Sequence, residues 1–233
     1  MDEWLAFARG PFFRFTFAVM VLGLARSVIV TLWSVARARR LTEHKDVSWG
    51  RVAAQTVDWI VPLRHLRQHR LFSGLSVLFH IGVILTPILL WAHIQLIDAN
   101  LGLSWWALPG GVADVLTLVT VGAALALLLS RLAGRASRVI SRAQDWTLPA
   151  LLTVPFLSGF LAAHPGVNPF PYDPTMLVHV LSGGVCFLVI PFTKLAHMAL
   201  LPLTRLPSEL AWRFPDSYPE AVARQVGKEG QPI

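Results

Sequence analysis

The sequence predicts an all-α integral membrane protein that crosses the bilayer five times, with its N-terminus outside and its C-terminus in the cytoplasm. Hydrophobic residues make up 55% of the 233 residues, and the mean hydropathy is +0.58. A soluble domain seldom has so apolar a composition. The third observation is that basic residues gather in alternate loops, which is typical of multi-pass membrane proteins.

Five apolar segments are long enough to cross the hydrocarbon core, which takes about 20 helical residues. Residues 71–97 and 146–172 contain no Lys, Arg, Asp or Glu. Each segment is expected to be helical, because lipid offers no hydrogen-bond partners to an open strand. The expected spans are residues 12–36, 74–97, 107–130, 147–163 and 175–201.

The basic residues give these spans a direction. Segments 37–73 and 131–146 hold eight and four Lys or Arg residues, whereas the intervening loops 98–106 and 164–174 hold none. Basic loops stay on the cytoplasmic side, which places the N-terminus outside and the C-terminus inside. The membrane is expected to be the cytoplasmic (inner) membrane of a bacterium or archaeon. The net charge of +7 is then a topology signal and not a sign of nucleic-acid binding.

The chain is expected to form one membrane domain, residues 1–202, followed by a cytoplasmic tail, residues 203–233. Within the domain, residues 37–73 form a basic cytoplasmic insert. Its apolar residues from Val52 to Leu66 lean to one side of a helix, which favours an amphipathic segment on the inner membrane surface.

Four histidines lie inside two of the expected spans, His80 and His93 in the second and His179 and His197 in the fifth. On a continuous helix the eighteen residues from His179 to His197 make five full turns, so both imidazoles leave one face about 27 Å apart. The two spans run in opposite directions. His80 then matches His197 in the inner half of the bilayer, and His93 matches His179 in the outer half. Two such pairs of neutral imidazoles suit two bis-histidine haem groups.

His93 fits this scheme least well. It follows His80 by thirteen residues, which places the two about 140° out of phase on an ideal helix. Pro87 lies between them, and a proline kink could bring His93 round. For a single membrane histidine, the alternative is a hydrogen bond to a neighbouring carbonyl.

Two cations lie at lipid depth in the inner half, Arg26 in the first span and Lys194 one turn before His197. The propionates of an inner haem would need such partners. For Lys194, snorkelling to the membrane surface is an equal alternative.

Asp114 lies about two turns into the third span from the outer side. Together with His93, and with His164 or Asp98, it could accept protons when a quinol is oxidised there. The alternative is a carboxylate in contact with external water.

These residues also carry a resemblance to a known family. Leu78-Phe79-His80-Ile81-Gly82 opens the second span, and Pro191-Phe192-Thr193-Lys194-Leu195 lies between His179 and His197. Over residues 12–202 the chain resembles the gamma subunit of respiratory nitrate reductase, a membrane cytochrome b with five spans. The resemblance implies two haem b groups, the inner one on His80 and His197 and the outer one on His93 and His179. It also implies quinol oxidation near the outer haem, with menaquinone or ubiquinone, and electron transfer to an iron–sulfur subunit on the cytoplasmic side.

Two features depart from that family, the longer spacing between His80 and His93 and the basic insert at 37–73. Both look more like membrane subunits of sulfur-metabolism and heterodisulfide-reductase-like complexes. The resulting hypothesis is a subunit of an oxidoreductase complex that oxidises quinol or reduces quinone, with the terminal-substrate site on another subunit. The alternatives are a haem-free membrane anchor of a redox enzyme and a transporter whose histidines relay protons.

Overall fold

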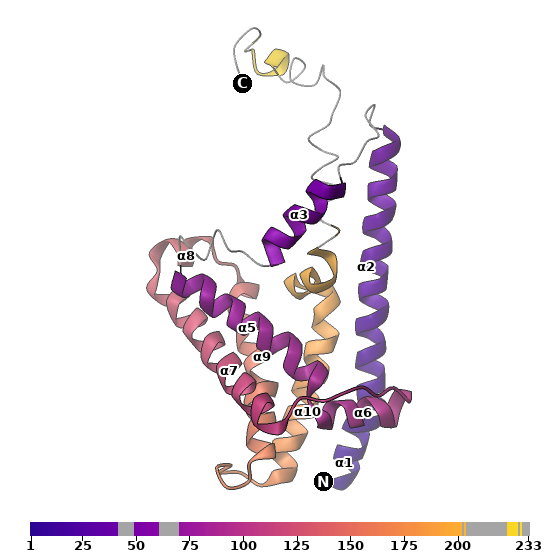
Figure 1. Cartoon of the computed structure of the whole chain (residues 1–233), viewed down its shortest axis with the longest axis vertical. Helices are drawn as coiled ribbons and strands as arrows, with labels where there is room; N and C mark the ends of the chain where they lie inside the picture. Colours follow the sequence, from indigo (N-terminus) through magenta and orange to yellow (C-terminus); the bar gives the residue numbers. More distant parts are fainter. Residues whose placement is uncertain (42–48, 61–69, 202, 204–222, 228, 230–233) are drawn as a thin grey trace. The chain divides into compact units, whose positions relative to one another are not determined.

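The computed structural model is helical, with no strand among the residues that it describes (Figure 1). It divides into a first unit, Met1–Leu22 with Arg64–Leu195, and a second unit, Gly23–Leu63 with Ala196–Ile233. The described residues are 1–41, 49–60, 70–201, 203, 223–227 and 229.

Within the described part of the chain, five helical segments are long and apolar enough to span a membrane, which confirms the number of spans predicted from the sequence. They are Asp2–Arg37, Leu71–Leu89, Gly110–Ala133, Ala143–Ala163 and Tyr172–Phe192. Many of their large apolar side chains are exposed in the single chain, as lipid-facing side chains would be. The chain is therefore a multi-pass helical membrane protein. The side of the membrane on which each terminus lies stays a prediction.

The first span consists of α1 (Asp2–Phe7), the π-helical turn η1 (Ala8–Phe12) and α2 (Phe13–Leu41). Pro11 lies inside η1 and has no N–H to donate, so the regular hydrogen-bond ladder is interrupted there. Single π-helical turns within α-helices are frequent at functional sites.

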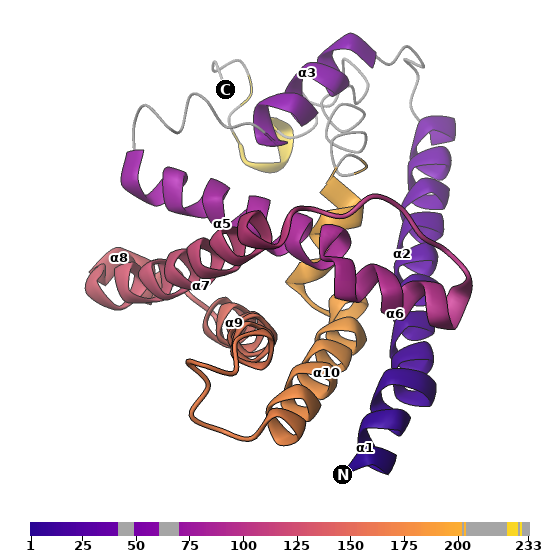
Figure 2. The same ribbon diagram turned by 60° about the horizontal axis from the view of Figure 1, so that its bottom comes forward.

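Four further helices pack against one another in chain order within the first unit: α5 (Arg70–Leu89) on α7 (Gly110–Ala133), α7 on α9 (Ala143–Ala163), and α9 on α10 (Tyr172–Val189) (Figures 1 and 2). The short helix α8 (Arg135–Ile140) connects α7 to α9. The close approach of α5 and α7 depends on Gly82, because a Cβ there would overlap with Oγ1 of Thr120. Small residues at helix contacts are how membrane helices come close.

The second expected span is not one continuous helix over 74–97. Helix α5 ends at Leu89, Leu90 is extended with φ −75° and ψ 125°, and α6 (Trp91–Leu101) begins after it. The chain changes direction at this point (Figure 1). The change lies three residues beyond Pro87, so it is a break at Leu90 and not the proline kink expected from the sequence.

The break releases three carbonyls that a continuous helix would use internally, and each finds another donor. Trp105 Nε1–H donates to Ile88 O at 2.8 Å, and Leu108 N–H donates to Leu89 O at 2.9 Å. Pro87 O accepts a hydrogen bond from Nδ1 of His93 at 3.0 Å. Unpaired backbone groups are costly in lipid, so these bonds make the break tolerable.

The fifth expected span also ends early. After α10 come two 3₁₀ turns, η2 (Ile190–Phe192) and η3 (Lys194–Ala196), on either side of an extended Thr193 with φ −126° and ψ −177°. Thr193 Oγ1 donates to Val189 O at 2.8 Å, which supports the turn. The α-helix is not continuous from His179 to His197, so the inference that five regular turns place both on one face is wrong.

In the second unit, α3 (Trp49–Ile60) overlaps the amphipathic segment expected over residues 52–66. Residues 61–66 and most of the expected tail, 203–233, lie outside the described residues.

Replacing Trp105 by Phe keeps an aromatic ring but removes the N–H that Ile88 O accepts. We expect a loss of about 1 kcal/mol, the net value of a typical hydrogen bond, and a melting temperature lower by about 2–4 °C. Thermal unfolding in detergent measures it. Trp106→Phe, at an exposed neighbouring ring, is the matched control and should leave the melting temperature unchanged. Equal behaviour of the two variants would contradict the role of Trp105.

Candidate paired-histidine site

His93 on the first turn of α6 and His179 in the middle of α10 face each other. Their Nε2 atoms are 3.5 Å apart, and the two rings are nearly parallel, with an angle of 10° and centroids 5.7 Å apart. Both side chains are half-buried. The structure therefore brings together the two histidines that the sequence places in the outer half. The break at Leu90, and not a kinked continuous helix, directs His93 toward its partner.

Each imidazole is oriented through its other ring nitrogen. His93 Nδ1 lies 3.0 Å from Pro87 O, and His179 Nδ1 lies 2.8 Å from Pro155 O. A carbonyl oxygen only accepts, so each Nδ1 carries a proton. In two neutral rings, the Nε2 lone pairs then point at each other. That arrangement becomes favourable when a cation, either a proton or a metal ion, lies between them.

The distance and the donor set decide what kind of metal the pair suits. Two imidazoles on one metal need Nε2 atoms about 4 Å apart, twice a metal–nitrogen bond of about 2.0–2.1 Å, and the pair has 3.5 Å. Carbonyl acceptors at Nδ1 are the usual support of metal-ligating histidines. Two imidazoles supply two ligands, so the other positions of such a metal would be filled by another group, as the macrocycle does in haem.

Helix α9 makes room for the His179 ring. A Cβ at Gly159 would lie 2.7 Å from both Cε1 and Nδ1 of His179. The absence of a side chain lets the ring reach the backbone of α9, where it donates to Pro155 O. Neither Gly159 nor Pro155 is recognisable from the sequence, because their role depends on how α9 and α10 pack.

The two histidines of the expected inner pair lie in different units. His80 on α5 is exposed, and its Nδ1 lies 2.7 Å from Ser76 O. The same tautomer argument makes Nε2 the nitrogen that would bind a metal. His197 follows η3 in the second unit, so the pairing of His80 with His197 stays a prediction.

Asp114 on α7 is paired with His164, which follows the last residue of α9. Its Oδ2 lies 3.3 Å from Nε2 of His164, and the side chains are 41% and 35% exposed respectively. His164 Nδ1 lies 2.9 Å from Phe160 O, and the ring stacks on that of Phe160 with centroids 4.2 Å apart. Because Nδ1 bonds to a carbonyl, the Oδ2–Nε2 contact is a hydrogen bond only when a further proton lies between them. Both side chains are also partly open to solvent.

The two cations proposed for haem propionates differ in their surroundings. Lys194 Nζ lies 2.6 Å from Oδ1 of Asp145, whose Oδ2 accepts from Arg142 N–H at 2.9 Å and caps α9. Asp145 was not expected from the sequence as a partner of Lys194. Arg26 lies on α2 in the second unit and is exposed in the single chain. The propionate role of both cations stays a prediction.

Fold and site together define a multi-pass helical membrane protein with a half-buried imidazole pair. No protein-family model matches the chain, and no solved structure matches it. A protein of Nitratidesulfovibrio vulgaris (strain Hildenborough), described by the single word "Protein", is 32% identical over 207 residues, which cover 86% of this chain and 89% of the relative. The chain belongs to the family of this bacterial protein.

Proposed function

We propose that the chain is a di-haem b membrane subunit that carries electrons between a quinone pool and an iron–sulfur partner subunit. The observation that supports this best is the His93–His179 pair, with opposed Nε2 atoms and both Nδ1 protons held by carbonyls. Two axial imidazoles leave a haem no open position, which suits electron transfer more than oxygen chemistry. The haem supplies a one-electron couple, and the chain supplies its ligands and their orientation.

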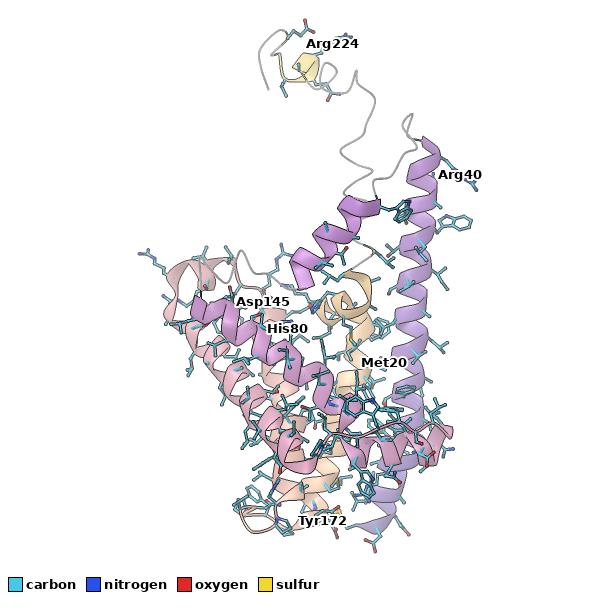
Figure 3. All side chains as sticks on the ribbon, in the orientation of Figure 1. Met20, Arg40, His80, Asp145, Tyr172 and Arg224 are labelled. Atoms are coloured by element: carbon cyan, nitrogen blue, oxygen red, sulfur yellow. The ribbon has the colours of Figure 1, made fainter. Side chains whose placement is uncertain are left out.

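A second bis-histidine site on His80 and His197 would complete a path across the bilayer. Figure 3 shows His80, on α5, well away from Tyr172 at the start of α10. The His93–His179 pair lies on α6 and α10. The two haem sites would therefore lie at different depths in the bilayer. Arg26 and Lys194 remain the proposed cations for the inner propionates.

The Asp114–His164 pair is the proposed proton acceptor for a quinol such as menaquinol or ubiquinol. Quinol oxidation releases protons, and a carboxylate hydrogen-bonded to an imidazole and open to water can take one and pass it on. Nε2 of His164 faces Asp114, whereas Nε2 of His93 faces His179, so Asp114 would act with His164 and not with His93. The complex would oxidise quinol or reduce quinone here and act on its terminal substrate in another subunit.

A second candidate function follows from the same pair. One proton shared between His93 and His179 would also satisfy both Nε2 atoms, and this favours a transporter whose histidines relay protons. The two candidates differ in their spectra, because only a haem protein has a b-type α-band.

A reduced-minus-oxidised spectrum of the purified chain should show a b-type α-band with two haems per chain. His93→Ala and His179→Ala should each lose the same one of the two haems, because each variant removes one axial ligand of one iron. His164→Ala is the matched control at a paired imidazole and should keep both haems. Absence of the α-band in the wild-type chain would overturn the haem proposal and leave the proton relay.

Gly159→Ala should weaken binding of the outer haem by about 10-fold or more, because the added Cβ displaces His179 from Pro155 O and support of this kind is worth 10–100-fold in metal affinity. Haem content per chain after purification measures it. Gly183→Ala is the control on α10, where a Cβ meets nothing within 4 Å. That variant should keep both haems, and a normal haem content in both variants would contradict the assigned site.

Asp114→Asn should slow reduction of the haems by a quinol analogue by about 10²-fold, the lower range for a positioned general base, with haem content unchanged. Stopped-flow absorbance at the α-band follows the reaction. Asp2→Asn, at an exposed carboxylate on α1, is the control and should react at the wild-type rate. If the two variants react equally fast, Asp114 is not the acceptor.

A further inference from the structure

Arg9 is a half-buried cation at the same end of the first unit as the His93–His179 pair. It lies in the π-helical turn η1, close to the N-terminus. Tyr172, its hydrogen-bond partner, marks this end of the unit in Figure 3. The cations expected from the sequence near haem propionates, Arg26 and Lys194, both belong to the inner site, and Arg9 was not among the expected site residues.

Arg9 is held by the two helices that carry the paired histidines. Its carbonyl accepts a hydrogen bond from Asn100 Nδ2 of α6 at 3.1 Å, and the same amide donates to Leu96 O at 2.8 Å. Its Nη2 donates to Tyr172 Oη at the start of α10, at 3.4 Å. The backbone of Arg9 is thereby tied to the helix of His93, and its guanidinium to the helix of His179.

Tyr172 and His179 are seven residues apart in the continuous α10, which places them on one face with about 10.5 Å of rise between them. Arg9 therefore lies on the same side of α10 as the imidazole, near the N-terminal start of the helix.

No carboxylate within the described part of the chain neutralises Arg9. The ion pairs found there join His164 to Asp114, Lys194 to Asp145 and Arg224 to Glu229. The loops 98–106 and 164–174 contain no Lys or Arg. A guanidinium has five N–H donors, and among the described residues the acceptor of its hydrogen bond is a neutral phenol. A half-buried charge held in this way is suited to an anion that the chain itself does not supply.

We propose that Arg9 binds a carboxylate of the tetrapyrrole held between His93 and His179. Haem b carries two propionates on its rim, and a guanidinium binds a carboxylate through two parallel hydrogen bonds. This inference rests on the proposed function, because it needs a haem on the paired histidines. A phospholipid phosphate could offer the same anionic chemistry, and the experiment separates the two sources.

The test is a redox titration of the purified full chain, with native haem, in wild-type, Arg9→Gln and Arg14→Gln forms. A cation at the propionate favours the ferrous haem, which carries one positive charge fewer. Arg9→Gln should therefore lower the midpoint potential of one haem by the equivalent of about a tenfold change in the ferric-to-ferrous ratio, about 59 mV. Arg14, an exposed cation on the same span whose Nε donates to Gly10 O, is the matched control and should cause no shift.

The second arm replaces native haem by its dimethyl ester, which has no carboxylate to bind. With the ester, Arg9→Gln and wild type should have equal potentials. A shift that persists with the ester means that Arg9 acts through space or binds a lipid phosphate, and this overturns the proposal. An unshifted potential with native haem overturns it as well.

Arg9→Lys keeps the charge and serves if Arg9→Gln does not fold. The lysine cannot make the two parallel hydrogen bonds of a guanidinium. Native haem should therefore transfer from Arg9→Lys to an excess of apomyoglobin about tenfold faster than from the wild-type chain. The dimethyl ester should transfer equally fast from both proteins. Equal rates with native haem overturn the inference. A chain with a normal α-band and no response at Arg9 refutes this inference alone, whereas a chain without an α-band refutes the proposed function with it.

Discussion

Backbone carbonyls released inside a membrane must find new donors, and the arrangement around His93 depends on this constraint. The break at Leu90 leaves Pro87, Ile88 and Leu89 without their helical partners. One of the three carbonyls takes the Nδ1 proton of His93, and loop residues that follow α6 cap the other two. The interruption that looks like a defect in α5 is thereby the element that orients a candidate ligand.

His179 is oriented by the same principle from the opposite side. Its ring crosses to α9 and donates to Pro155 O, and Gly159 leaves the space for it. The two imidazoles thus have their protons assigned by carbonyls on two different helices, and their lone pairs are brought together as a consequence. Arg9 extends this arrangement, because α6 and α10 hold the cation as well as the two histidines.

Much of this architecture was predictable because lipid restricts what a chain can do. Five long apolar segments have to be helices, and the described residues contain five of them. His93 and His179, which the sequence matches by their positions along two spans, are in contact in the structure. The continuous helix from His179 to His197 failed because Pro191 and the extended Thr193 interrupt it. The phase problem at His93 disappeared because α5 and α6 are separate helices.

The sequence by itself determined the class of the protein, the number of its spans and the histidines worth pairing, because hydropathy and ionisable residues at lipid depth are properties of composition and position. Only the tertiary structure decided which nitrogen of each ring carries the proton, that Asp114 meets His164, and that Arg9 is hydrogen-bonded to groups of α6 and α10. Each of these contacts depends on a group from another segment of the chain, and the sequence of one helix does not specify which neighbour will supply that group.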